Sequence, residues 1–266
     1  MTKLGEIECY LLDMDGTIYL SDQLIDKAKE FVDTLEKKAK DYVFFTNNSA
    51  KNSKDYQQKL ERLGLSIPLE RIVNSGEVTA DYIRSQKEGA KVYPLGTPSF
   101  EKELEEAGLE LVKEKQAGID FVALAFDTTL TYQKLWDAHD LILSGVEYVA
   151  ANPDYVCPLK DGKTMPDCGS MISLLETSTG KKPLVIGKPN SLMIDYVAKN
   201  LGISKANLAM VGDRLYTDIQ MAIDADITSI LVLSGETDRE MLAEAPQDPD
   251  FVFESVAEIK KKLEEL

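Results

Sequence analysis

The sequence has little of the residues on which several common kinds of functional site depend. Its 266 residues include one histidine, His139, and three cysteines, Cys9, Cys157 and Cys168. A single histidine excludes a histidine-rich metal site, and the cysteines show no CxxC spacing. Three cysteines cannot all pair with one another, so we expect reduced thiols that serve in packing or in loops.

Positive charge is also scarce. Lysine and arginine number 30 against 46 aspartates and glutamates, which gives a net charge of −16. No basic patch is present to neutralise a phosphate backbone, so nucleic acid is not an expected partner. An anionic substrate would have to be attracted locally, by a bound cation, a well-placed lysine or backbone N–H groups.

Long apolar runs are missing as well. None approaches the roughly 18 to 20 residues that a membrane-spanning helix needs. The first residues, Met1–Glu8, are polar and lack the apolar centre of a signal peptide. We therefore expect a cytoplasmic protein without a membrane partner. Hydrophobic residues make up 44% of the chain, which is ordinary for a soluble globular protein with a substantial core.

What the sequence does contain is a regular alternation of short apolar runs and amphipathic stretches. Cys9–Leu12 and Tyr42–Phe45 are predicted strands near the N-terminus, and helices are predicted over about 25–38, 51–63 and 77–86. Further strands are predicted towards the C-terminus at Leu184–Ile186, Leu208–Val211, Ile227–Leu233 and Phe251–Phe253. This alternation predicts an α/β fold with a doubly wound parallel sheet covered by helices on both faces.

The middle of the chain, residues 85–182, has strands and helices of its own. We interpret it as an inserted α/β cap domain. The core would then combine residues 1–84 with residues 183–266.

Four polar clusters each follow a predicted core strand. They are Asp13–Thr17, Thr46–Ser49, Gly187–Pro189 and Gly212–Asp218. In a doubly wound sheet, residues just past the carboxyl ends of parallel strands converge on one crevice. A single Asp-x-Asp-Gly run is commonly only a turn, but four such clusters in matching positions predict one functional site.

The residue types in these clusters suit phosphoryl transfer. Asp13 ends a buried strand, where a carboxylate is costly unless a cation pairs with it. The oxygens of Asp13, of the Asp15 backbone carbonyl and of Asp213 are ligands suited to a hard cation such as Mg2+. The Asp15 carboxyl could protonate a leaving oxygen and later activate water.

The remaining cluster residues suit the binding of a phosphate. Gly16 permits a tight turn that brings backbone N–H groups to an anion. Thr46 and Asn47 can donate to phosphate oxygens, and Lys188 supplies the missing positive charge. Asp218 is better placed to orient Lys188 or a metal-bound water than to bind metal directly.

These four motifs, in this order, resemble those of the haloacid dehalogenase (HAD) superfamily of phosphatases. The long segment between the second and third motifs resembles the cap of subclass IIA, the NagD-type and 4-nitrophenylphosphatase-type enzymes. The similarity extends into the cap and covers nearly the whole chain, through Thr131–Leu135, Ala151–Asp154 and Thr179–Pro183. It implies a Rossmann-like HAD core with an inserted α/β cap.

The resemblance also implies residue roles. Asp13 would be the nucleophile that forms an aspartyl-phosphate, and Asp15 the general acid/base. The phosphate would be held by Thr46, Asn47, Asn48 and Lys188. Mg2+ would be held by Asp13, Asp15 and Asp213, with Gly16 and Asp218 in support.

The expected function is therefore that of a Mg2+-dependent phosphatase of small phosphomonoesters. Sugar, glycerol, nucleotide and cofactor phosphates fit under such a cap, and 4-nitrophenyl phosphate would be an artificial substrate. The resemblance further implies a homodimer formed through the cap.

Substrate choice is assigned to the cap. Asn152, Asp154 and Tyr155 follow a predicted cap strand and are candidate substrate contacts, with a plain Asx-turn as the alternative. Asp167 is a further candidate. It stands in Pro166–Gly169, where many relatives have a glycine that reaches positive φ, a region that aspartate tolerates less well.

Two other functions are compatible with a strand-end aspartate. A phosphotransferase such as a phosphosugar mutase would share the covalent intermediate, but family mutases carry a helical cap soon after the first motif. Here only 28 residues, Ile18 to Phe45, separate the first two motifs. A non-catalytic regulator that binds phosphate compounds would not need Asp15, so this residue favours turnover.

Overall fold

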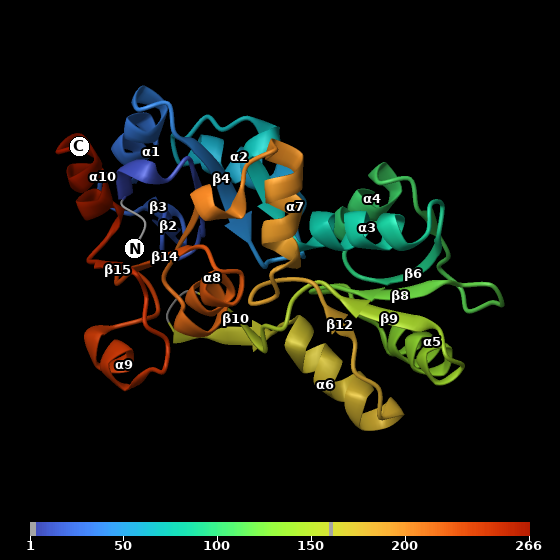
Figure 1. Cartoon of the computed structure of the whole chain (residues 1–266). Coiled ribbons are helices and arrows are strands. Elements are labelled where there is room, and N and C mark those ends of the chain that lie inside the picture. The colour runs from blue at the N-terminus through green and yellow to red at the C-terminus, as the bar shows by residue number, and fades with distance from the viewer. Residues whose placement is uncertain (1–3, 160–161) are drawn as a thin grey trace. The chain divides into compact units, whose positions relative to one another are not determined.

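The computed structural model describes residues 4–159 and 162–266, and these form two compact units (Figure 1). Unit 1 combines the chain up to Thr46 with Gln57–Val73 and the chain from Lys188 onward. Unit 2 combines Asn47–Tyr56 with Asn74–Gly187. Each unit has its own parallel sheet, which confirms the predicted α/β class with a second α/β element.

Unit 1 is built on a six-stranded sheet. From one edge to the other its strands are β15 (Phe251–Phe253), β14 (Thr228–Val232), β13 (Leu208–Gly212), β1 (Cys9–Leu12), β4 (Asp41–Thr46) and β5 (Ile72–Asn74). The pairings from β15 to β4 are all parallel. Every residue of β1 and β13 is buried, because helices cover both faces of a doubly wound sheet.

The helices of unit 1 follow the predicted alternation. The sequence predicts a helix over about 25–38, but α1 starts only at Ala28 because Lys27 before it is left-handed (φ 61°). The α-helices are α1 (Ala28–Lys37), the end of α2 (Ser53–Arg62), α7 (Leu192–Leu201), α8 (Gln220–Asp224), α9 (Arg239–Glu244) and α10 (Val256–Glu264). Short elements are 3-10 helices η1 (Leu4–Glu6), η2 (Leu69–Arg71) and η4 (Lys205–Asn207), π-helix η5 (Leu215–Ile219), and hairpin strands β2 (Tyr19–Leu20) and β3 (Gln23–Leu24).

Unit 2 contains a five-stranded sheet and a separate hairpin. The sheet runs β12 (Leu184–Val185), β9 (Glu147–Ala150), β8 (Phe121–Leu124), β6 (Lys91–Leu95) and β7 (Glu110–Leu111), with parallel pairings throughout. The antiparallel hairpin pairs β10 (Val156–Pro158) with β11 (Thr164–Pro166). Its helices, apart from the start of α2, are α3 (Ser75–Gln86), α4 (Pro98–Glu106), α5 (Tyr132–Leu143) and α6 (Cys168–Thr179).

The two faces of the unit 2 sheet have separate cores. Along β8, Phe121 and Ala123 pack with residues of α3 and α4, whereas Val122 and Leu124 pack with residues of α5 and α6. Figure 1 shows α3 and α4 on one side of these strands and α5 and α6 on the other. The alternation follows from the two-residue period of a strand.

One strand belongs to a different sheet from the one that the sequence predicts. Leu184–Ile186 is predicted in the C-terminal part of the core, but β12 pairs with β9 at the edge of the unit 2 sheet. A short apolar run has the same composition in either sheet, so periodicity could not assign it. The predicted domain limits at 84/85 and 182/183 stay a prediction, since compactness alone does not define separately folding domains.

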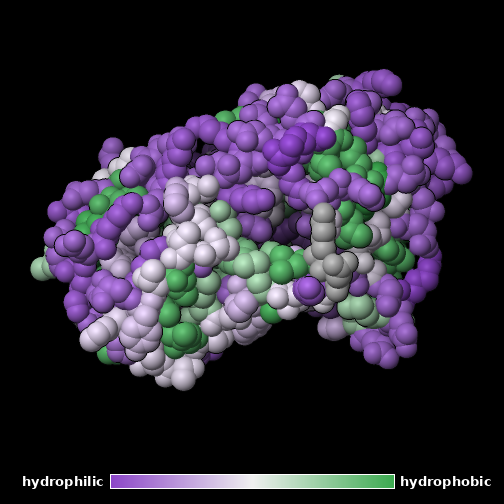
Figure 2. Space-filling model, turned by 180° about the vertical axis from the view of Figure 1, so that it is seen from behind, coloured by the Kyte–Doolittle hydropathy of each residue, from purple (hydrophilic) through white to green (hydrophobic). Residues whose placement is uncertain are grey.

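The surface agrees with the composition. Hydrophilic residues cover most of the face in Figure 2, and apolar residues appear there as separate patches. Among the described residues, no helix has the length and apolar character needed to cross a membrane. The three cysteines are free thiols. Burial raises the pKa of the Cys9 thiol to about 12 and raises that of Cys168 as well, so neither is an activated nucleophile.

A buried glutamate ties three helices of unit 2 together. The Glu103 side chain on α4 accepts hydrogen bonds at Oε1 from Asn74 Nδ2 (2.6 Å) and from the Ser53 backbone N–H (3.2 Å). Its Oε2 atom is buried without a hydrogen-bond partner. Burial raises the pKa of Glu103 to about 8, against the opposing effect of the Asn74 hydrogen bond.

This shift predicts a pH dependence of stability. The folded state holds the Glu103 proton more tightly than the unfolded chain, whose carboxyl has a pKa of 4.5. The stabilisation is therefore complete below pH 4.5 and is lost as the pH rises through about 8. Between pH 6 and pH 9 we expect a loss on the order of 2 kcal/mol in the free energy of unfolding. Denaturant unfolding of the wild type and of Glu103→Gln at both pH values measures this change in the free energy of unfolding.

Glu103→Gln should lack this part of the pH dependence, because its amide stays neutral. Glu106→Gln is the control, since Glu106 lies on the same helix and is exposed. Equal pH dependence in the wild type and Glu103→Gln would contradict the prediction.

Candidate active site

Three strand ends of unit 1 meet at one edge of the sheet. Leu12, the last residue of β1, lies in register with Val211 of β13 on one side and with Phe44 of β4 on the other. The Asp13 backbone N–H donates to the Val211 carbonyl (2.9 Å), which continues the pairing by one residue. Asp13 and Asp213 therefore leave neighbouring strands side by side, as the sequence predicts for parallel strands.

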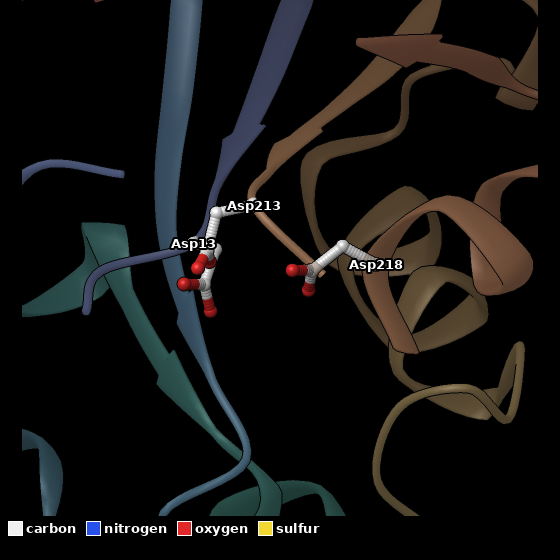
Figure 3. A group of neighbouring side chains, drawn as sticks. All are labelled: Asp13, Asp213 and Asp218. Carbon is white, nitrogen blue, oxygen red and sulfur yellow. The ribbon is translucent and has the colours of Figure 1, made fainter. Parts of the chain in front are cut away.

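Three buried carboxylates converge there (Figure 3). Asp13, Asp213 and Asp218 each offer an oxygen within 4.8 Å of the others. Their exposed fractions are 8%, 2% and 0%. Figure 3 shows the carboxylates of Asp13 and Asp213 close together at the ends of β1 and β13, with the Asp218 carboxylate reaching towards them from η5.

Lys188 lies between two of these carboxylates. Its Nζ pairs with Asp13 Oδ1 and with Asp218 Oδ1 (2.7 Å), and it also contacts the Phe45 carbonyl oxygen (3.4 Å). Burial by itself lowers the pKa of Lys188, but the charges of Asp13 and Asp218 outweigh it and hold the pKa above its usual value. Lys188 is therefore a fixed positive charge that is paired with Asp13 and Asp218.

One lysine does not balance three carboxylates. Burial raises the pKa of Asp13 to about 7, although Lys188 opposes the shift, and burial also raises the pKa of Asp213 well above its usual range. Asp213 Oδ1 is buried without a hydrogen-bond partner. Buried carboxylate oxygens that lack a counter-charge fit a hard divalent cation such as Mg2+.

A fifth strand-end cluster, which the sequence reasoning missed, holds Asp213 in place. After β14, the Glu236 backbone N–H donates to Asp213 Oδ2 (2.6 Å) and the Thr237 N–H donates to the Asp213 carbonyl (3.2 Å). The Ser234 hydroxyl donates to the Gly16 carbonyl (2.8 Å), so the same loop also contacts the turn after Asp13. Its signal in the sequence was the polar run that follows Ile227–Leu233.

Glycine is required on both sides of the Asp213 carboxylate. A Cβ atom at Gly235 or at Gly16 would collide with Asp213 Oδ2. Gly16 also has φ +90°, which side chains rarely adopt. The Gly16 N–H donates to the Tyr19 carbonyl (2.8 Å) and so closes the turn within the protein.

Asp15 and Arg214 lie around this cluster. The Asp15 side chain is exposed to solvent. Desolvation by the surrounding protein nevertheless raises its pKa, and the charges of Lys59 and Arg214 partly offset this shift. Arg214 Nε pairs with Glu236 Oε2 (2.9 Å), and its charge opposes the raised pKa of Asp13. Arg214 thus forms an ion pair, and its charge acts on Asp13.

The second motif is divided between the two units. Thr46 ends β4 and is buried in unit 1. Asn47, Asn48 and Ser49 belong to unit 2. Asn48 Oδ1 accepts from the Ala50 N–H (3.1 Å), which is a local turn.

Three of the four cap candidates form a polar network within unit 2. Asn152 Nδ2 donates to Asp154 Oδ2 and to Asp167 Oδ1, both at 3.0 Å. Tyr155 is 66% exposed, and its carbonyl accepts from the Asp167 N–H (3.0 Å). The concern that residue 167 needs positive φ is wrong: Asp167 is extended (φ −111°) and caps α6.

Family models and curated relatives match this chain. The model of the haloacid dehalogenase-like hydrolases matches residues 10–110, and that of the HAD-hydrolase-like family matches residues 185–259. The acid sugar phosphatase of Staphylococcus haemolyticus is 35% identical over 259 residues, covering 96% of this chain and 97% of the relative. That of Staphylococcus aureus is 34% identical over 262 residues, covering 97% and 100%.

Solved structures show the same relationship. A 4-nitrophenylphosphatase from Thermotoga maritima has a TM-score of 0.93 and 45% identity, covering 97% of this chain and 98% of the other. A glycerol phosphate phosphatase from Mycobacterium tuberculosis in complex with magnesium has a TM-score of 0.89 and 29% identity, covering 98% and 79%. NagD from Escherichia coli K-12 has a TM-score of 0.87 and 27% identity, covering 95% and 98%.

A doubly wound sheet with acidic and basic side chains at its strand ends, joined to an α/β cap, defines a class of hydrolase. The chain belongs to the haloacid dehalogenase-like hydrolases. Within them it is a phosphoric monoester hydrolase of subclass IIA, the group of the NagD-type and 4-nitrophenylphosphatase-type enzymes.

Proposed function

We propose that this phosphatase hydrolyses small phosphomonoesters with Mg2+ through an aspartyl-phosphate on Asp13. The observation that carries the proposal is the buried cluster at the strand ends. Lys188 pairs with Asp13 and Asp218, while Asp213 keeps one buried oxygen without a partner. A phosphoryl group and a divalent cation supply the charges that this set of side chains lacks.

The proposed reaction has two steps. In the first, a carboxylate oxygen of Asp13 attacks phosphorus, the bond from phosphorus to the leaving oxygen breaks, and Asp15 gives its proton to that oxygen. In the second, Asp15 takes a proton from water, the water oxygen attacks phosphorus, and the acyl-phosphate bond breaks to release phosphate and free Asp13. The raised pKa of Asp15 suits a group that must first give and then take a proton.

The other site residues would bind and neutralise charge. Lys188, Thr46, Asn47 and Asn48 are proposed to hold the phosphate. The buried Lys188 ammonium is already fixed by Asp218, so it needs little reorganisation when charge develops on the phosphoryl oxygens.

Mg2+ would be held by Asp13, Asp213 and the backbone carbonyl of Asp15. When bound, it would neutralise the carboxylates and the phosphoryl oxygens. The support in this chain is the partnerless Asp213 Oδ1 and the oxygen-only donor set. Gly16 and Gly235 are proposed to keep Asp213 in place, since neither position has room for a side chain.

The proposed substrates are sugar, glycerol, nucleotide and cofactor phosphates, with sugar phosphates first. The curated relatives in Staphylococcus are named acid sugar phosphatases, and one solved structure is a glycerol phosphate phosphatase.

A phosphomonoester panel tests the proposal. We expect release of inorganic phosphate from 4-nitrophenyl phosphate and from at least one sugar or glycerol phosphate, dependent on added Mg2+. Addition of EDTA should lower the rate by at least about 100-fold, because the metal neutralises charge in the transition state. Excess Mg2+ should restore the rate.

Two outcomes would contradict the proposal. Full activity in EDTA would exclude the metal from the reaction. Formation of an isomerised sugar phosphate instead of inorganic phosphate would indicate a phosphotransferase, because a sugar hydroxyl and not water would accept the phosphoryl group.

A further inference from the structure

The side chain of Asn47 is held by an aspartate far along the chain. Asn47 Nδ2 donates to Asp154 Oδ2 at 3.0 Å, across 107 residues of sequence. The same Asp154 oxygen accepts from Asn152 Nδ2, also at 3.0 Å. One carboxylate oxygen of Asp154 therefore receives two amide N–H groups, and both donors and the acceptor lie in unit 2.

Further hydrogen bonds hold Asn152 and Asn47 in place. Asn152 is fully buried, and its Oδ1 accepts from the Ser49 hydroxyl (2.9 Å), which in turn accepts from the Phe126 N–H (2.9 Å). The Asn47 carbonyl accepts from the Ser75 hydroxyl (2.6 Å). Residues 47–49 are thus bonded to the ends of β8 and β9 and to the start of α3.

The contact leaves the Asn47 amide one orientation. Its Nδ2 faces Asp154, and its Oδ1 lies beside Gly187, where a Cβ atom would come within 2.7 Å of that oxygen. An asparagine without such a partner can exchange its amide oxygen and nitrogen by rotation about one bond. A carboxylate accepts hydrogen bonds only, so Asp154 opposes the reversed orientation, in which two oxygens would meet.

We infer that Asp154 is a positioning residue that acts on phosphate binding through Asn47, and not a residue that contacts the substrate. This inference rests on the proposed role of Asn47 in holding the phosphate. Asp154 fixes the orientation of the Asn47 amide, with Nδ2 towards Asp154 and Oδ1 beside Gly187. It thereby also restrains the conformation of the chain directly after Thr46. Asn152 supports Asp154 by donating to the same oxygen.

The test uses the inhibition constant of inorganic phosphate together with kcat and KM for 4-nitrophenyl phosphate. Asp154→Ala should raise the phosphate inhibition constant on the order of 10-fold, the effect of losing one well-oriented donor. Asp154→Asn should stay within about threefold of the wild type, because its amide oxygen can still accept from Asn47. Rescue by this conservative variant separates orientation from charge.

A double-mutant cycle shows whether the effect passes through Asn47. Asn47→Ala should raise the inhibition constant to a similar extent. Adding Asp154→Ala to Asn47→Ala should then change it little, because residues that act through one another are not additive. A purely structural role of Asp154 would give effects that add.

Asp127→Ala is the matched control. Asp127 is another buried carboxylate of unit 2, and it accepts from Lys134 Nζ (2.8 Å). Its loss should lower the thermal stability of the protein and leave the phosphate inhibition constant unchanged. If Asp154→Ala fails to fold, Asp154→Ser is measured in its place, because serine also lacks the carboxylate that accepts from Asn47 and Asn152.

The outcomes separate the two proposals. If Asn47→Ala raises the inhibition constant and Asp154→Ala does not, the positioning role is overturned while the phosphate role of Asn47 stands. If Asn47→Ala itself leaves the constant unchanged, the proposed role of Asn47 is wrong, and the inference is wrong with it. Additive effects in the double variant also overturn the inference.

Discussion

Asp13→Asn is expected to lose turnover of 4-nitrophenyl phosphate by at least about 1,000-fold while the protein stays folded, because an amide cannot form the acyl-phosphate. The substitution keeps the shape of the side chain, so the packing at the end of β1 is retained. The loss should appear in kcat over the whole pH range and should not be recovered by more Mg2+.

The stability of the same variant gives a second and independent readout. The pKa of Asp13 is raised to about 7 by burial, so ionisation of this carboxyl costs folding free energy as the pH rises from 3.8 through 7. Asparagine removes that cost. In EDTA at pH 8 we therefore expect Asp13→Asn to unfold at the same temperature as the wild type or at a higher one.

Asp33→Asn is the control for the chemical change, since Asp33 is a half-exposed residue of α1 that pairs with Lys29. It should alter neither turnover nor stability by a measurable amount. Near-normal turnover by Asp13→Asn would falsify the covalent mechanism, and an unfolded variant would show that the carboxylate is required for the fold.

Lys188→Met should produce the second large effect. It removes the ammonium group that pairs with Asp13 and Asp218 and leaves two buried carboxylates with fewer counter-charges. Breaking a buried ion pair from one side costs about 3 kcal/mol or more of stability. The loss of a fixed cation facing the phosphate should lower kcat/KM by on the order of 100 to 1,000-fold.

The effect of Mg2+ on the melting temperature gives Lys188→Met a second, specific readout. Mg2+ stabilises the folded state to which it binds, and the carboxylates left by Lys188→Met favour a cation more strongly than those of the wild type. We expect the rise in melting temperature on adding Mg2+ to be larger for Lys188→Met than for the wild type, while activity stays low. Thermal unfolding with and without Mg2+ measures both.

Lys134→Met is the matched control, because Lys134 also pairs with a buried aspartate, Asp127, but in unit 2. It should lower stability without a metal-dependent recovery and should keep kcat/KM within a few-fold. Activity of Lys188→Met within threefold of the wild type would exclude a phosphate-binding role for this lysine.

The strand-end clusters were predictable because periodicity and turn residues are local properties. Continuous apolar runs before Asp13 and Asp213 indicate strands buried on both faces, and the structure has them as β1 and β13. Parallel strands end at the same edge of a sheet, so adjacency of these two aspartates followed from the fold class alone. The loop at Ser234–Thr237 obeyed the same rule and was missed because it contains no strongly suggestive residue type.

Other features depended on which distant segments meet. The run at Leu184–Ile186 has the same composition in either sheet, and only the pairing of β12 with β9 assigns it to unit 2. Asp167 was expected to be strained by comparison with relatives, yet it is extended and caps α6, a role that aspartate fills well.

By itself, the sequence determined the α/β class, the four motifs and the chemistry of their side chains. Burial periodicity and residue type depend only on residues that are close together in the sequence. Only the tertiary structure decided the partners: Lys188 with Asp13, 175 residues away, and Asn47 with Asp154, 107 residues away. A hydrogen bond depends on distance and direction in space, and one sequence records neither for residues so far apart.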